Sequence, residues 1–286
     1  MNIYVVLILQ LLVASGTHIV AKAVTADVDP VTLTFLRTII SGLGMILLLR
    51  ARKISWKVDR SDVKRLLLLG LLGIPLNQFL YLYGIGYTTA ANGALLYATT
   101  PVLVMVLSGI LLKERVTVRK AAGILLAFGG VVIVIFERGL DFSSGYTYGN
   151  IVIFVAVIAW GLFTVLGRPL ILKYGALKIT CLAMLAGTAM YFPVGVVGAI
   201  INPIHDISAT DWIGILYLGI GTSIVGYVLW YYAIGRIDVS KVAVFANGQP
   251  ILATVLAMVF LDYVITGNFV VGGIMTLAGV ILTQLS

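Results

Sequence analysis

The chain has 286 residues, of which 61% are hydrophobic and only 10% are charged, and its formal net charge at pH 7 is +8. A water-soluble domain usually carries about 25% charged residues. A soluble fold could not bury so much apolar surface, so we expect lipid to be the solvent for most of this chain. The single cysteine, Cys181, lies in an apolar stretch and excludes an intrachain disulfide.

Ten apolar segments follow one another with short connections. Each has roughly 18–23 residues, close to the ~20 that cross a hydrocarbon core of ~30 Å. The pattern predicts an all-α integral membrane protein with ten transmembrane helices. The segments are 3–24, 31–49, 66–87, 90–112, 118–136, 150–170, 179–201, 212–234, 239–261 and 268–285.

The basic residues alternate between the two sides of these segments. The loops after the even-numbered segments carry 16 of the 19 lysines and arginines, and the other side carries only Lys22 and Arg138. Positive charge marks cytoplasmic loops, so we expect both termini to be cytoplasmic, in a cell membrane. Because the charges are spread over four loops, they argue against nucleic-acid binding. Arg37 lies within the second segment, and we expect Arg37 and Lys22 to extend to the outer surface.

An internal repeat appears when the sequence is shifted by 149 residues. Each half, 1–140 and 141–286, then holds five helices, and an odd number inverts the second half relative to the first. Inverted repeats are typical of secondary transporters, whose sites lie near the middle of the membrane between the repeats. An ancient duplication in a protein without transport activity is the alternative. The shift aligns Pro101 with Pro250, Gly123 with Gly272 and Gly130 with Gly279.

Short characteristic motifs occur in each half. The first half has TTAANGALLYATTP at 88–101 and LLKER at 111–115, and the second has YLG at 217–219, QP at 249–250 and GV at 279–280. This pattern resembles the EamA family of the drug/metabolite transporter superfamily over nearly the whole chain. The resemblance implies ten helices, a central cavity, and efflux or exchange of amino acids and related metabolites.

Several other functions lack the residues they need. All eleven carboxylates lie in loops or at helix ends, which argues against an intramembrane acid–base enzyme. No phosphate-binding G-x-x-x-x-G-K-[ST] motif occurs, and His18 and His205 have no metal-ligand company. We therefore expect no enzymatic activity, no cofactor, no metal and no obligate protein partner. The expected partners are a small-molecule substrate and the bilayer.

Polar and aromatic residues recur at matched positions within the apolar segments. Gln78 and Tyr81 share a helix face, and the shift aligns them with Tyr227 and Trp230. Unpaired amides are costly in hydrocarbon, so these groups should face a cavity; hydrogen bonding between helices is the alternative. His18 is a candidate because ionisable groups inside membranes are often functional; a neutral histidine with satisfied hydrogen bonds is the alternative. The predicted substrate-binding residues are His18, Gln78, Tyr81, Tyr97, Thr100, Trp160, Tyr227, Trp230 and Gln249.

Pro101 and Pro250 lie near the middle of the fourth and ninth segments. A proline removes a backbone hydrogen bond, so it should kink each helix and free carbonyls near Tyr97 and Ala246. A kink with a purely structural role is the alternative. Together these observations favour a secondary transporter of small metabolites, and the family resemblance implies that it exports amino acids or similar zwitterions or facilitates their passage. A phosphorylated or nucleotide-linked sugar exchanger and a membrane scaffold or receptor are the alternatives.

Overall fold

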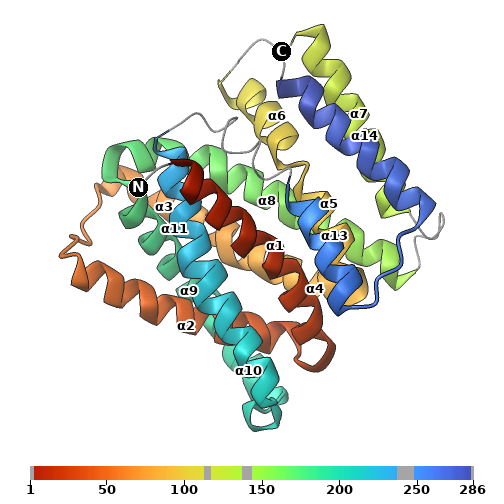
Figure 1. Cartoon of the computed structure of the whole chain (residues 1–286). Coiled ribbons are helices and arrows are strands. Elements are labelled where there is room, and N and C mark those ends of the chain that lie inside the picture. Colours follow the sequence, from red (N-terminus) through yellow and green to blue (C-terminus); the bar gives the residue numbers. More distant parts are fainter. Residues whose placement is uncertain (1–2, 113–116, 137–143, 237–247, 285–286) are drawn as a thin grey trace.

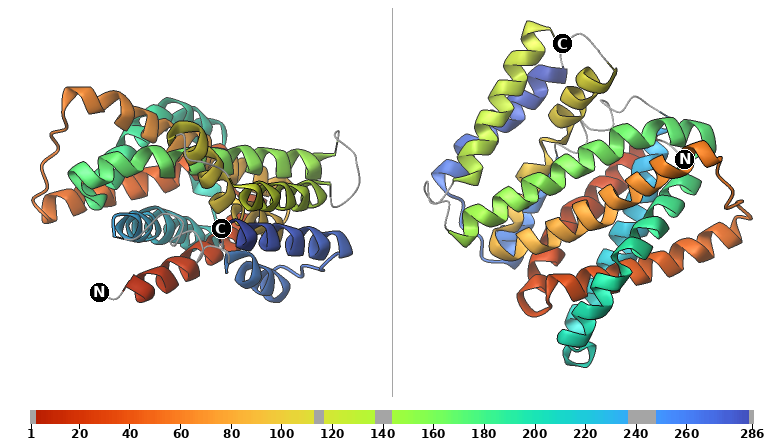
Figure 2. Two further views of the ribbon diagram at one scale, coloured as in Figure 1. Left: turned by 90° about the horizontal axis from the view of Figure 1, so that it is seen from above. Right: turned by 180° about the vertical axis from the view of Figure 1, so that it is seen from behind.

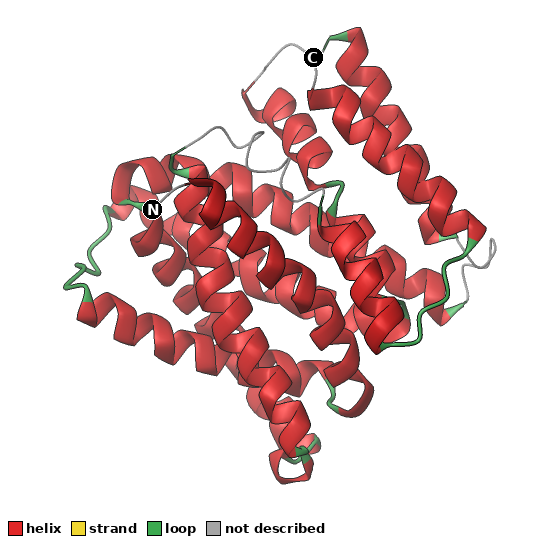
Figure 3. Ribbon diagram, in the orientation of Figure 1, coloured by secondary structure: helices red, strands yellow, loops and turns green. Residues whose placement is uncertain are grey.

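The computed structural model describes residues 3–112, 117–136, 144–236 and 248–284. All regular elements in these ranges are helices, and none of these residues forms a strand (Figure 3). Seven helical spans are long and apolar enough to cross a membrane, and three further apolar helices are shorter. The prediction of an all-helical protein is therefore confirmed for the described residues, and the apolar helices are consistent with a membrane protein.

Helices coincide with each of the ten predicted segments, although the ninth is described only from residue 248 onward. Two spans in the first half and one in the second are divided into consecutive pieces. The first half contains α1 (Ile3–Asp27), α2 (Pro30–Ala51), α3 (Arg60–Leu71), η1 (Leu72–Phe79), α4 (Leu80–Tyr87), α5 (Ala90–Tyr97), α6 (Thr100–Leu112) and α7 (Val118–Ile135). The second contains α8 (Gly145–Tyr174), α9 (Ala176–Ile201), the short η2 (Ile204–Asp206), α10 (Ala209–Leu216), η3 (Tyr217–Gly226), α11 (Tyr227–Ile234), α13 (Gln249–Phe260) and α14 (Gly267–Gln284).

Local sequence explains where several helices begin and end. Asp29 caps α2, because its Oδ2 accepts hydrogen bonds of 3.0 Å from the backbone N–H groups of Val31 and Thr32. Pro30 then occupies the first turn, where its missing N–H costs nothing. Gly175 separates α8 from α9 with a φ of 87°, a conformation that strains residues with a side chain.

Three spans are irregular in the middle. The third and eighth contain the π-helical segments η1 and η3, and such segments are often found at functional sites. The fourth span is interrupted between α5 and α6, directly before Pro101. The hydroxyls of Thr99 and Thr100 donate hydrogen bonds of 2.6 Å to the carbonyls of Leu96 and Tyr97, so the break leaves these two carbonyls paired.

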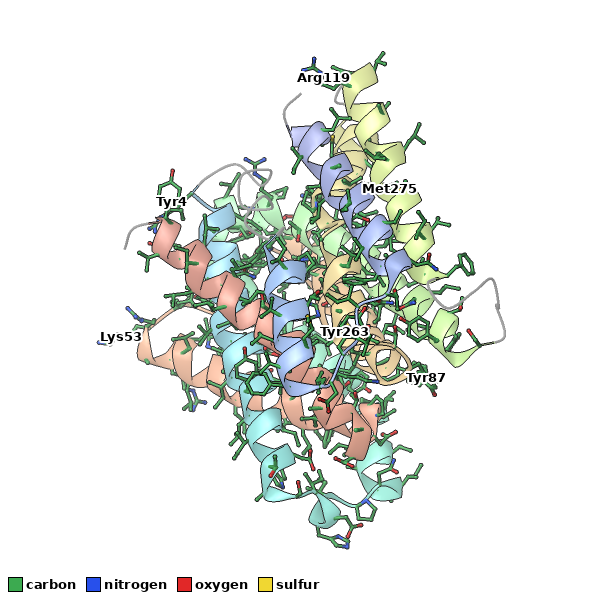
Figure 4. The ribbon with its side chains drawn as sticks, turned by 45° about the vertical axis from the view of Figure 1, so that its right-hand side comes forward. Tyr4, Lys53, Tyr87, Arg119, Tyr263 and Met275 are labelled. Atoms are coloured by element: carbon green, nitrogen blue, oxygen red, sulfur yellow. The ribbon has the colours of Figure 1, made fainter. Side chains whose placement is uncertain are left out.

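The long helix α8 packs against α4, η1, α5 and α6 of the first half, while α2 of the first half packs against α9 (Figure 1). Phe163 and Ile153, both on α8, are completely buried. The two halves of the sequence are therefore interleaved rather than side by side. In Figure 4, Lys53, in the loop after α2, and Tyr87, at the end of α4, lie on opposite sides of the molecule.

The helices α7 and α14 lie side by side at one edge of the molecule (Figure 2). Their backbones approach closely at glycines: a Cβ added to Gly130 would stand 2.5 Å from the carbonyl oxygen of Gly272, and one added to Gly279 would stand 2.6 Å from that of Gly123. Small residues permit such close packing between membrane helices. The shift of 149 residues exchanges these two contacts.

Candidate functional site

One cavity lies between helices of both halves, and about 90 Å³ of it is open to the centres of water-sized molecules. All nine predicted substrate-binding residues line this cavity, together with five polar or charged residues that were not among them. The predicted set is His18, Gln78, Tyr81, Tyr97, Thr100, Trp160, Tyr227, Trp230 and Gln249, and the additional five are Gln10, Thr17, Arg37, Asn77 and Thr222.

One wall of the cavity comes from the first half. His18 on α1 is 3% exposed, and its Nδ1 shares a hydrogen bond of 2.7 Å with the hydroxyl of Tyr81 on α4. Tyr97, at the end of α5, completes an edge-to-face cluster in which ring centroids are 5.4–5.7 Å apart. His18 therefore has a hydrogen-bond partner within the cluster.

A second wall is an aromatic cluster from the second half. Trp160 on α8 stacks on Phe163 at 5.5 Å between ring centroids, and it contacts Tyr227 at 5.1 Å and Trp230 at 5.6 Å. The indole N–H of Trp230 is buried and has no hydrogen-bond partner among the described residues. The wall offers aromatic faces to an apolar or cationic group and one free donor.

Asn77, in η1, joins the two walls. Its Nδ2 donates to the hydroxyl of Tyr97 at 2.6 Å and to the carbonyl of Ala156 at 2.9 Å, and its Oδ1 accepts from the hydroxyl of Tyr227 at 3.2 Å. We did not predict Asn77 from the sequence. The available signal was a second amide directly beside Gln78 in an apolar segment, and the π-helical turn allows both neighbours to line the cavity.

The other amides and Thr100 differ in how much of their hydrogen-bonding capacity is free. Gln78 is 1% exposed, and neither of its amide atoms makes a hydrogen bond of good geometry within the described ranges. Gln249 is 7% exposed and begins α13. The Thr100 hydroxyl lines the cavity, but it already donates its hydrogen bond to the Tyr97 carbonyl.

The expectation that Arg37 extends to the outer surface is wrong. Arg37 is 2% exposed and lines the cavity, and its Nε donates a hydrogen bond of 2.8 Å to the Ser223 hydroxyl. The side chain is anchored inward because a serine in η3 gives its guanidinium a partner. Lys22 is half-buried, and its Nζ donates to the carbonyls of Ile85 at 3.2 Å and Gly86 at 2.9 Å, at the end of α4.

The two prolines lie at helix starts. Pro101 is the second residue of α6 and follows the break in the fourth span. Pro250 is the second residue of α13. Ala246, whose carbonyl we expected Pro250 to free, lies outside the described residues.

The chemistry of the cavity is suited to a small molecule. Its described lining has one cation, several amides and hydroxyls, and two aromatic walls, but no carboxylate. Within the described ranges, no three histidine, cysteine, aspartate or glutamate side chains are grouped to hold a metal ion. Such a surface can bind a small molecule that has both a polar and an apolar part.

Comparisons with known proteins agree with this architecture. The model of the EamA-like transporter family matches residues 1–136 and 147–285. An uncharacterized transporter of Archaeoglobus fulgidus is 31% identical over 98% of this chain and 96% of its own length. A probable terminal-alkyne amino-acid exporter of Streptantibioticus cattleyicolor is 29% identical over 77% of this chain and 73% of its own length.

The fold also matches a known structure. A solved crystal structure with 23% sequence identity superposes with a TM-score of 0.70 and covers 98% of this chain and 96% of its own. The family match spans both halves of the sequence, and the similarity to the archaeal transporter is nearly full-length. This chain belongs to the EamA-like transporter family.

Proposed function

We propose that this chain is a secondary transporter that exports amino acids or related small metabolites, or lets them equilibrate across the membrane. The observation that carries the proposal is the cavity between the two halves, which combines aromatic walls with buried polar groups that have no hydrogen-bond partner among the described residues. An amino acid has the same combination of polar ends and a side chain that can be apolar. Sites of this kind lie between the repeats of many secondary transporters.

We further propose that residues 1–140 and 141–286 form two inverted halves, with both termini on the cytoplasmic side of a cell membrane. The two separate stretches matched by the family model support the division. The exchanged glycine contacts between α7 and α14 support a symmetric relation between the halves. The basic residues after the even-numbered segments support the orientation.

The choice of amino acids is supported by the name of the Streptantibioticus relative, a probable amino-acid exporter. A phosphorylated or nucleotide-linked sugar exchanger would need several cations in its site. Arg37 is the only lysine or arginine in the described lining, so the amino-acid proposal is favoured. A purely structural scaffold would not need a cavity lined by polar groups, and a receptor would bind a solute there without moving it across the membrane.

Transport by purified protein tests the proposal. Liposomes that contain the protein would be loaded with an unlabelled mixture of the standard amino acids, and entry of each labelled amino acid would be followed against protein-free liposomes. We expect exchange of at least one of them. Exchange of sugar phosphates but no amino acid would overturn the substrate class, and movement of no solute in a broad metabolite panel would overturn transport itself.

A further inference from the structure

Arg37 is held in place within the cavity. It lies on α2, is 2% exposed, and donates from Nε to the hydroxyl of Ser223 in η3 over 2.8 Å. Ser223 is itself completely buried and donates to the carbonyl of Leu218 at 3.0 Å. This chain of hydrogen bonds uses one of the five N–H groups of the guanidinium and fixes its orientation. Within the described residues, the four N–H groups on its two terminal nitrogens are left for another partner.

The charge of Arg37 has no compensating charge in the described part of the chain. Its electrostatic neighbours are the hydroxyls of Tyr81, Tyr97 and Tyr227, which are neutral groups, and no described aspartate or glutamate forms an ion pair with it. An isolated cation within a membrane protein is costly to keep away from water. A guanidinium retained at such a cost, and oriented by a dedicated serine, is suited to binding an anion.

A second, independent observation lies in the same cavity. Gln78 is 1% exposed, and both its amide nitrogen and its amide oxygen lack a hydrogen-bond partner of good geometry in the described ranges, although the Tyr227 hydroxyl is beside it. The indole N–H of Trp230 also has no partner there. Buried polar groups are normally paired, so these donors and this acceptor indicate that a polar ligand completes them.

The number of charges selects the kind of anion. One cation in an otherwise uncharged lining balances one negative charge, as in a carboxylate, whereas a phosphate monoester brings close to two. The planar guanidinium also matches the geometry of a carboxylate, which can accept two parallel N–H bonds. Thr17 and Thr222 do not provide two further donors for a larger anion, because their hydroxyls share a hydrogen bond of 2.7 Å with each other.

We propose that Arg37 binds the carboxylate of the transported molecule and that Ser223 positions the guanidinium for it. This inference rests on the proposed function and adds that the site requires a single carboxylate on its ligand. The apolar part of the ligand lies against the aromatic wall formed by Trp160 and Trp230. Arg37 is the binding residue, and Ser223 is a positioning residue.

The test compares ligands that differ only at the carboxylate. Thermal stabilisation of the purified protein would be measured with L-leucine, L-leucinamide and 3-methylbutylamine, and with L-phenylalanine, its amide and phenethylamine, since a ligand stabilises the state that it binds. We expect each acid to bind at least about tenfold more tightly than its amide or amine, the loss expected when a charge-assisted hydrogen bond is removed. Equal binding of acid and amide would overturn the proposed role of Arg37 in binding the carboxylate, and it would leave the transport proposal standing.

Variants assign the preference to Arg37. Arg37→Gln should bind acid and amide equally, Arg37→Lys should keep part of the preference, and Arg236→Gln, at an exposed arginine outside the cavity, should keep all of it. Ser223→Ala should lower the ratio of the affinity for the acid to the affinity for the amide. Ser223→Thr, which keeps a hydroxyl, should have the wild-type ratio. A ratio that is unchanged in Arg37→Gln would overturn the proposal. If Arg37→Gln does not fold, the wild-type acid-to-amide ratio and that of Arg37→Lys remain decisive.

Two further probes separate this inference from the proposed function. Hexanoate and glucose 6-phosphate would be included in the panel. If hexanoate binds to the wild type but not to Arg37→Gln, and no amino acid binds, carboxylate binding by Arg37 would be supported. The same result would overturn the proposal that amino acids are the substrates. Binding of glucose 6-phosphate more tightly than of any carboxylate would overturn carboxylate binding by Arg37 in favour of a phosphate site, and stabilisation by no compound would overturn both proposals.

Discussion

The hydroxyl of Tyr227 on α11 donates a hydrogen bond of 3.2 Å to Oδ1 of Asn77 in η1. The two residues are 150 positions apart in the sequence and belong to different halves. Because Asn77 also donates to Tyr97 and to the carbonyl of Ala156, one buried amide connects both walls of the cavity with the backbone of α8. The shape of the cavity therefore depends on the distance between these spans.

Replacing Asn77 with alanine should destabilise the protein. The substitution leaves the Tyr97 and Tyr227 hydroxyls and the Ala156 carbonyl without this partner, and an unsatisfied buried group costs about 1–3 kcal/mol. Thermal unfolding in detergent would measure the change. Asn202→Ala, at an exposed residue after α9, is the matched control and should have little effect. Equal unfolding temperatures for Asn77→Ala and the wild type would show that the hydrogen bonds of Asn77 do not stabilise the folded protein.

Replacing Tyr81 or Trp230 with alanine should reduce transport while the protein stays folded and monodisperse. Tyr81 is 4% exposed and Trp230 is 2% exposed, and both line the cavity. Loss of an aromatic contact at a binding site often costs 2 kcal/mol or more, so substrate binding should weaken by roughly tenfold or more. Trp56→Ala, at a half-exposed tryptophan in the loop after α2, is the control. Full transport of the same substrate by both variants would mean that the cavity is not the route.

The cluster at the end of α8 should weaken in acid. Lys173 donates to Asp59 at 2.5 Å and to Asp62 at 2.7 Å, and the Tyr174 hydroxyl donates to Asp62 at 2.7 Å. The hydrogen bond from Lys173 lowers the pKa of Asp59 below its ordinary value of 3.8. A carboxyl whose pKa is lower in the folded protein contributes stability above its unfolded pKa and loses that contribution as the pH falls through its folded pKa.

Thermal unfolding between neutral pH and about pH 3 would detect this contribution. Because Asp59 is exposed, we expect the unfolding temperature to decrease only slightly as the pH falls below about 4. The decrease in unfolding temperature should be smaller in Asp59→Asn. Asp27→Asn, at an exposed aspartate that ends α1, is the control. The same acid dependence in Asp59→Asn as in the wild type would contradict the assignment.

The proposed orientation predicts which loops can be labelled from outside. In a background with Cys181→Ala, a cysteine at Ser55 should be protected from an impermeant thiol reagent in intact cells, and a cysteine at His205 should react. Ser55 lies in the loop after α2, and the His205 side chain is 80% exposed after α9. Permeabilised cells provide the control, since both positions should then react. The opposite pattern would reverse the orientation.

Transport should need no imposed ion gradient. No described carboxylate lines the cavity, and proton-coupled carriers commonly use a membrane-embedded carboxylate or histidine. His18 is the only histidine in the cavity's described lining, and its Nδ1 shares a hydrogen bond with the Tyr81 hydroxyl. We expect substrate to equilibrate across proteoliposomes with or without a pH step, and His18→Gln to change affinity more than direction. Uphill accumulation driven by the pH step and lost in His18→Gln would make His18 the coupling residue.

The sequence by itself determined the lipid environment, the helical class and the positions of the apolar segments. It could do so because a membrane span needs about twenty apolar residues in a row, and this requirement is local. It also identified cavity residues such as Gln78 and Trp230, because a polar or amphipathic group in an apolar segment must find a partner wherever the chain folds. Their common cavity could be anticipated from the repeat, which aligns Gln78 with Tyr227.

The tertiary structure decided the direction and partners of individual side chains. A long arginine near a helix end can reach the surface or turn inward, and Arg37 turns inward because Ser223, 186 positions away, accepts its hydrogen bond. Asn77 is placed in the cavity by a π-helical turn that contains Pro75, and Thr100 bonds to a carbonyl beside the break in the fourth span. Each outcome depends on which distant groups meet at one place, and that information is not contained in the local pattern of any single segment.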